Sequence, residues 1–178
     1  MVVPQVTMAS GGVAPTLTFS VSDNDIFFGT LSVTASQWAD NTADGSTTAV
    51  VAHTLTAATS STSGYTITVQ GATLTSTGTP ADTITAIGDP SAALNPTTEQ
   101  FGLRITASGG SGAVSSPYNH ASNYAYAANA TTTDVIATSA TNSTDTTYSL
   151  YYAANIATTT EAHSDYQAAL TYVITGNF

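Results

Sequence analysis

The chain has 178 residues, a formal net charge of -10 and no cysteine. Charged residues make up only 7% of it, against roughly 25% in an ordinary domain. Arg104 is the sole lysine or arginine, so the positive charge that binds nucleic acid or an anionic membrane surface is missing. Without cysteine, disulfides and thiolate metal sites are excluded.

The location of the protein is inferred from what the sequence does not contain. It has neither a basic-then-apolar signal sequence nor an apolar stretch of membrane-spanning length. Its single basic residue offers trypsin-like proteases one cleavage site. We therefore expect the mature form of a protein of the cell surface or extracellular space, from which an export signal has been removed.

Alternation of apolar and polar residues predicts β-strands along most of the chain. The first core strand is predicted at residues 17–21 and, after a turn at Asp23-Asn24-Asp25, a second is predicted at residues 26–35. Further strands are predicted at residues 51–56, 65–70, 101–106, 148–154 and 170–174, with shorter ones around Leu74, Ile84 and Ile87.

Residues 107–133 are rich in Gly, Ser, Ala and Asn and predict an ordered but irregular excursion. Residues 168–178 alternate regularly and end in Phe178, which predicts a paired core strand. The nine or ten strands, without a helical pattern between them, predict an all-β fold: a single Greek-key or jelly-roll-like β-sandwich over residues 16–178.

The N-terminal segment, residues 1–15, is predicted to be an extended strand outside this domain. Its apolar residues are Val2, Val3, Val6 and Met8, and Gly11-Gly12 forms a hinge before Pro15. Such a strand either completes a neighbouring subunit, by donation into an open sheet edge, or packs as the first strand of its own domain.

Candidate metal and catalytic groups are sparse. Asp23 and Asp25 are weak candidates for calcium ligands, with turn formation as the alternative, and no other cofactor is expected. His53, His120 and His163 lack metal-ligand spacing, and His53 fits a hydrogen-bonded core histidine. With no Gly-x-Ser-x-Gly elbow and only dispersed carboxylates, the chain is not expected to be an enzyme.

Several aromatic side chains and two asparagines are candidates for contact with a partner or for carrying sugar. Tyr118, Tyr124 and Tyr126 either stack on sugars or pack in the core, and Trp38 either anchors a partner or covers the sandwich edge. Asn129 and Asn142 each begin an Asn-x-Thr pattern for N-glycosylation.

Several blocks of sequence carry a resemblance to a known group of proteins. They are Phe28-Gly29-Thr30-Leu31, Val51-Ala52-His53-Thr54-Leu55, the segment from Gly64 to Gly71, Glu99-Gln100-Phe101-Gly102-Leu103-Arg104, Ser115-Ser116-Pro117-Tyr118 and Tyr152-Ala153-Ala154-Asn155-Ile156. The chain resembles Thr-rich exported proteins of candidate phyla radiation (Patescibacteria-like) bacteria, which implies a bacterial surface location. In pattern it is also similar to TasA/camelysin matrix-fibre proteins, which implies polymerisation by strand exchange, and to WxL-type surface domains. Trp38 is followed by Ala39 and Asp40, so the Trp-x-Leu motif itself is absent.

Two functions remain open from the sequence. The first is a structural, pilin-like subunit of an extracellular filament or surface layer, self-assembling head to tail without covalent links. The second is a monomeric adhesion module for glycans or a host surface. Sortase-built pili and Lys-Asn isopeptide links both require a lysine, which the chain lacks.

Overall fold

The computed structural model describes residues 14–178, which fold into eleven β-strands without a helix. The strands are β1 (Leu17–Val21), β2 (Gln37–Trp38), β3 (His53–Thr59), β4 (Tyr65–Gln70), β5 (Gly88–Ala92), β6 (Gln100–Gly109), β7 (Ala113–Val114), β8 (Tyr124–Tyr126), β9 (Asp134–Ser139), β10 (Ser143–Asn155) and β11 (Thr171–Gly176). The predicted N-terminal strand, with Val2, Val3, Val6, Met8, Gly11 and Gly12, lies outside the described residues.

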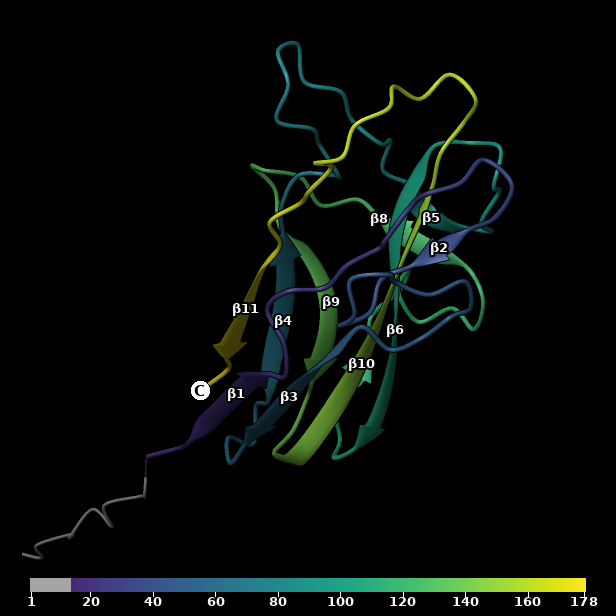
Figure 1. Cartoon of the computed structure of the whole chain (residues 1–178). Helices are drawn as coiled ribbons and strands as arrows, with labels where there is room; N and C mark the ends of the chain where they lie inside the picture. The colour runs from purple at the N-terminus through teal and green to yellow at the C-terminus, as the bar shows by residue number, and fades with distance from the viewer. Residues whose placement is uncertain (1–13) are drawn as a thin grey trace, which may run out of the picture.

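The strands form two antiparallel sheets that pack as a sandwich, which confirms the predicted fold class (Figure 1). The large sheet has the order β1-β3-β10-β6-β8-β5. β2 pairs with β10 on the same side as β3, beyond His53, the first residue of β3. The small sheet has the order β11-β4-β9-β7. Both sheets mix strands that are far apart in sequence, so the fold depends on long-range pairing.

The central strands show why alternation predicts this fold. In β4, Tyr65, Ile67 and Val69 are buried between the sheets, while Thr66 and Thr68 stay half-exposed on the outer face. The same inward and outward alternation runs through β3 and most of β10. Burial of these inward rows is the main stabilising contribution to the sandwich, at about 25 cal/mol per Å² of apolar surface.

The core is unusually rich in tyrosine, and its hydroxyls are paired inside it. Tyr65 and Tyr148 share a hydrogen bond of 2.9 Å, and the Tyr126 hydroxyl donates to the Gly71 carbonyl at 2.8 Å. Because a buried hydroxyl without a partner costs free energy, these pairs are what make so polar a core tolerable.

The predicted strand at residues 26–35 is wrong. This stretch is a loop that makes only isolated bridges, one of them between Phe27 and Asp40. Gly29 has a φ of 65° and lies against the backbone of Asp44, where a Cβ atom would be 1.9 Å from the Asp44 carbonyl oxygen. The close approach of these two loops needs glycine and bends the chain out of the extended conformation.

The short strands predicted around Leu74 and Ile84 are absent as strands, and the one predicted around Ile87 is shifted, because β5 begins at Gly88. Leu74 and Ile84 are buried, but the segment makes only isolated bridges, such as Thr75 with Thr83. The excursion at residues 107–133 is more regular than predicted, because it holds the end of β6, all of β7 and all of β8.

The C-terminal segment forms a paired strand, as predicted, but at an edge rather than in the middle of a sheet. β11 pairs with β4 from Thr171 to Gly176. Its other side pairs with no strand of residues 14–178, and Phe178 beyond it is 74% exposed. The prediction of a core strand that extends to Phe178 is therefore wrong in this respect.

Candidate functional site

One long side of the sandwich is open between two edge strands. β1 ends the large sheet and β11 ends the small sheet, and both lie on this side, beside the C-terminus (Figure 1). Both are anchored at the β3–β4 turn, where the Thr16 amide donates to Ser60 Oγ at 2.8 Å and the Ser61 hydroxyl donates to the Asn177 carbonyl. We call the opening between β1 and β11 the seam.

Inward-facing side chains on the two seam strands are only partly covered. Leu17 and Phe19 of β1, and Tyr172 and Ile174 of β11, pack against the core but remain half-buried. Their counterparts on the central strands are fully buried, among them Leu55 and Ile67. Within residues 14–178, the seam therefore exposes the side of a hydrophobic core together with backbone groups of two strands that no other strand pairs.

The other two edge strands, β5 and β7, are less suited to pair with an added strand. β7 spans only two residues, and β5 contains Pro90, which has no amide hydrogen to donate. Among the described residues, β1 and β11 are thus the edges best suited to accept another strand.

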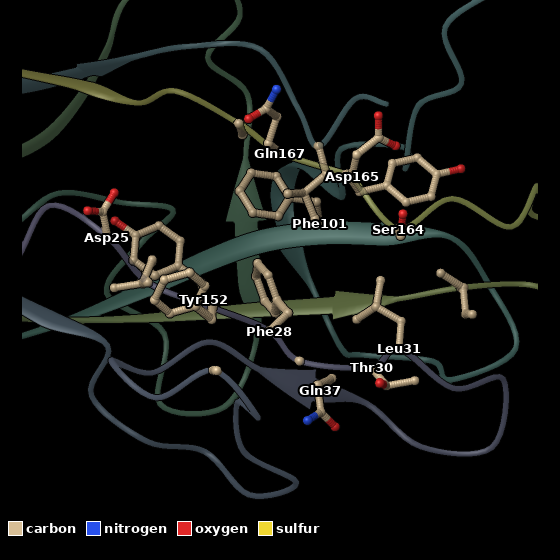
Figure 2. Close-up of a pocket in the computed structure, with 18 of the residues that line it drawn as sticks. Asp25, Phe28, Thr30, Leu31, Gln37, Phe101, Tyr152, Ser164, Asp165 and Gln167 are labelled. Carbon is tan, nitrogen blue, oxygen red and sulfur yellow. The ribbon is translucent and has the colours of Figure 1, made fainter. Parts of the chain in front are cut away.

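A pocket of about 1710 Å³ opens at one end of the seam. Figure 2 shows the rings of Phe28, Phe101 and Tyr152 gathered in its middle, with Asp25 on one side and Asp165 on the other. Its walls come from the loop that follows β1 and from the segment that leads into β11. The pocket therefore combines an apolar aromatic interior with a polar, mainly acidic rim.

Three hydrogen-bonded rings line the pocket on the core side. His53 Nε2 lies 2.8 Å from the Tyr152 hydroxyl, which in turn bonds the Tyr172 hydroxyl. His53 also stacks on Tyr152, with ring centroids 5.5 Å apart. We call this the His53 chain, and it confirms the interpretation of His53 as a hydrogen-bonded core histidine.

Burial sets the protonation of the His53 chain. Desolvation lowers the pKa of His53, although the nearby Asp23 carboxylate opposes this effect. Desolvation also raises the pKa of Tyr152 well above its ordinary value, and that of Tyr172 is raised for the same reason. At neutral pH the side chains of His53, Tyr152 and Tyr172 are therefore all uncharged. His53 Nδ1 is a buried nitrogen without a hydrogen-bond partner among the described residues.

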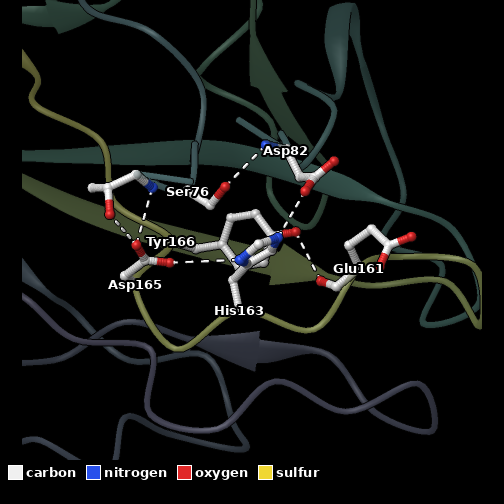
Figure 3. A network of polar contacts seen from close by, with 7 residues as sticks. Ser76, Asp82, Glu161, His163, Asp165 and Tyr166 are labelled. Atoms are coloured by element: carbon white, nitrogen blue, oxygen red, sulfur yellow. Dashed lines mark hydrogen bonds and ion pairs between the residues drawn. The ribbon is translucent and has the colours of Figure 1, made fainter. Parts of the chain in front are cut away.

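A second polar cluster lies on the rim of the pocket (Figure 3). His163 Nε2 is 2.7 Å from Asp82 Oδ2, and His163 Nδ1 is 3.9 Å from Asp165 Oδ1. Asp165 accepts from the Thr77 hydroxyl and, at 3.0 Å, from the Thr77 amide, and these two bonds are the main reason why the pKa of Asp165 is lowered. The cluster ties the segment before β11 to the loop at residues 76–82.

The remaining candidate residues from the sequence are scattered. His120 caps its own turn by accepting from the Ser122 and Asn123 amides, while His53 and His163 both border the seam pocket. Asp23 Oδ1 accepts from the Asp25 amide at 3.1 Å, which is turn formation. Within residues 14–178, no group of three or more His, Cys, Asp or Glu is placed to hold a metal ion, so calcium at Asp23 and Asp25 stays an untested prediction.

The tyrosine and asparagine candidates differ in exposure. Tyr118, Tyr124 and Tyr126 are all buried, which removes them as an exposed surface for sugar stacking. Core packing is confirmed for Tyr118 and Tyr126, whereas Tyr124 lies against Arg104 and Trp38 instead. Asn129 and Asn142 are exposed in loops, where glycosylation remains a prediction.

Sequence reasoning missed the seam pocket, because its residues come from segments more than a hundred positions apart. No protein-family model matches the chain, and no curated protein or solved structure is significantly similar to it. No helix of the described residues is long and apolar enough to cross a membrane.

Proposed function

We propose that the protein is a structural subunit of an extracellular filament or surface layer, assembled when the N-terminal segment of one copy enters the seam of the next. The observation that carries the proposal is the seam itself, where two strands that are sheet edges within residues 14–178 flank half-buried core side chains. An added strand would pair backbone groups at an edge and cover these apolar side chains.

The length and pattern of the N-terminal segment fit the seam. Residues 2–9 in extended conformation span about 25 Å, and the six residues of β11 span about 20 Å at 3.3 Å per residue. Val2, Val6 and Met8 would share one face of a strand with Pro4, which has no amide hydrogen to donate, and Val3 would lie on the other face. The face that carries Val2, Val6 and Met8 would be the one to meet the half-buried residues of the seam.

Charge is compatible with this interface between copies. Two chains of net charge -10 repel one another, so a stable contact must avoid placing carboxylates together. β1 (LTFSV) and β11 (TYVITG) carry no charged side chain, and neither do residues 1–13. Donation would therefore join the copies through uncharged side chains.

Donation from one copy to the next is a head-to-tail contact. Each subunit offers one segment and one seam, so the contact does not close on itself and propagates as a filament. The extracellular location belongs to this proposal and is supported by the composition of the chain.

Imaging a deletion variant tests the proposal. We expect the full chain to form regular filaments under the electron microscope and the variant lacking residues 1–12 to give dispersed, folded particles. Phe19→Asp, which places a charge in the seam, should also block assembly. Val135→Asp, on an exposed position away from the seam, is the matched control and should not. Undiminished filaments from the deletion variant would contradict strand donation.

The second candidate function, a monomeric module that binds glycans or a host surface, is favoured by the seam pocket. Aromatic rings beside hydroxyl, amide and carboxylate groups suit a polyhydroxylated ligand. Dispersed particles from both the full chain and the deletion variant would favour this function.

A further inference from the structure

The outer face of the large sheet carries a cluster of large side chains away from the seam. β10 and β6 place Tyr151 directly opposite Arg104, while their neighbours Tyr152 and Leu103 point into the core. The guanidinium carbon of Arg104 lies 4.0 Å from the centre of the Tyr151 ring and 5.7 Å from that of Tyr124. The guanidinium is thus held against aromatic rings on the face opposite the core.

Trp38 completes the cluster. It pairs with Ala153, which pairs in turn with Gly102 on β6, so two small residues lie beside it in the outer row. Ala153 is 0% exposed although it points outward, and the Trp38 indole nitrogen donates to the Tyr124 hydroxyl at 2.6 Å. We call Trp38, Tyr124, Tyr151 and Arg104 the arginine platform.

The charge of the platform is uncompensated. Arg104 is the only Lys or Arg of a chain with 11 Asp and Glu residues, yet none of the carboxylates in residues 14–178 forms an ion pair with it. Its Nε is buried without a hydrogen-bond partner within the same range. Contact with an aromatic ring offsets only part of this cost, because it supplies no hydrogen-bond acceptor.

We propose that the arginine platform binds the carboxylate of an acidic sugar, a uronic acid residue of a glycan. The planar guanidinium fork matches a carboxylate in a two-point hydrogen bond. Beside it, the half-exposed Trp38 offers an aromatic surface to a sugar ring. Ser149 and Thr106, paired in the next outward row, offer hydroxyls to the sugar hydroxyls.

The uronic acid is favoured over a highly charged polymer by the rest of the protein. A protein of net charge -10 repels polyanions. A uronic acid carries one carboxylate and several hydroxyls, and the platform offers one guanidinium with hydroxyl side chains beside it. The platform does not overlap the seam, so this binding is independent of strand donation and each is tested without the other.

Two single-residue signals make the test direct. Trp38 is the only tryptophan, so intrinsic fluorescence reports on the platform, and Arg104 gives the only arginine Nε–H resonance in an NMR spectrum. We would titrate the full chain with the methyl glycoside of galacturonic acid, which carries one carboxylate, and, as the neutral control, with the methyl glycoside of galactose. The acidic sugar should quench the fluorescence saturably and shift the Nε–H resonance, and the neutral sugar should do neither.

Variants then test the role of the charge. Arg104→Gln should weaken binding of the acidic sugar about tenfold or more, and Arg104→Lys should weaken it because the planar guanidinium fork is lost. An Nε–H resonance that does not move with millimolar acidic sugar, or quenching that is equal with the neutral sugar, would overturn the proposal. A short glutamate peptide that shifts the resonance when the sugar does not would also overturn it, in favour of a protein carboxylate.

Discussion

The Tyr152→Phe substitution removes the central hydroxyl of the His53 chain while keeping the ring. His53 Nε2 and the Tyr172 hydroxyl then both lose a partner. Leaving a buried polar group unpaired costs about 1–3 kcal/mol. We expect the free energy of unfolding to fall by about 2–4 kcal/mol, which lowers the melting temperature by roughly 5–15 °C in a chain of this size.

Tyr172→Phe is the matched control, because it removes the terminal hydroxyl and leaves the bond between His53 and Tyr152 intact. It should cost about 1 kcal/mol, the contribution of one hydrogen bond. Both variants are compared with the parent by thermal and urea unfolding, followed by circular dichroism. Equal losses in the two variants, or no loss in Tyr152→Phe, would refute the argument that Tyr152 joins two otherwise unpaired groups.

Three further predictions concern the core. Because the pKa of His53 is lowered in the folded state, the unfolded chain binds a proton at this residue at a higher pH than the folded chain does. The free energy of unfolding should therefore fall as the pH drops below about 6.5, by at most about 1.4 kcal/mol per pH unit. The fall should be less steep in His53→Gln. Burial raises the pKa of Tyr126 to about 12 and also raises that of Tyr148, so the free energy of unfolding should fall above about pH 10. Tyrosinate absorbance and the unfolded fraction should then rise together. Ionisation of these tyrosines in the folded protein near pH 10 would contradict this prediction. Gly112→Ala would place a Cβ atom 1.9 Å from the Tyr148 hydroxyl and should cost about 1–3 kcal/mol in urea unfolding, whereas Gly78→Ala, with its nearest contact at 3.3 Å, should cost less.

The sequence predicts the fold best where a strand lies in the middle of a sheet. In β4 and β10 the inward positions are buried on one face, so the pattern of apolar residues follows the pleat closely. Residues 26–35 also alternate, but there the apolar side chains pack from an irregular loop whose path is set by the contact between Gly29 and Asp44. A local pattern does not distinguish these two ways of covering the same core.

The seam and the arginine platform could not be predicted from the sequence for a different reason. Whether Phe19 is fully buried depends on which strand lies beside β1, and that is decided by pairing with distant parts of the chain. Arg104 is conspicuous in the sequence as the only basic side chain, but its contact with Tyr151 follows from the register of β6 against β10. Only the long-range register brings such residues together.

The most direct test of strand donation is amide hydrogen exchange on the chain that lacks residues 1–12, with and without a synthetic peptide of residues 1–13. Donation predicts that the peptide binds the folded chain and slows exchange at β1 or β11, the two strands that border the seam, while central strands such as β4 and β10 stay unchanged. Exchange at β1 and β11 that is unaltered at saturating peptide would contradict the account.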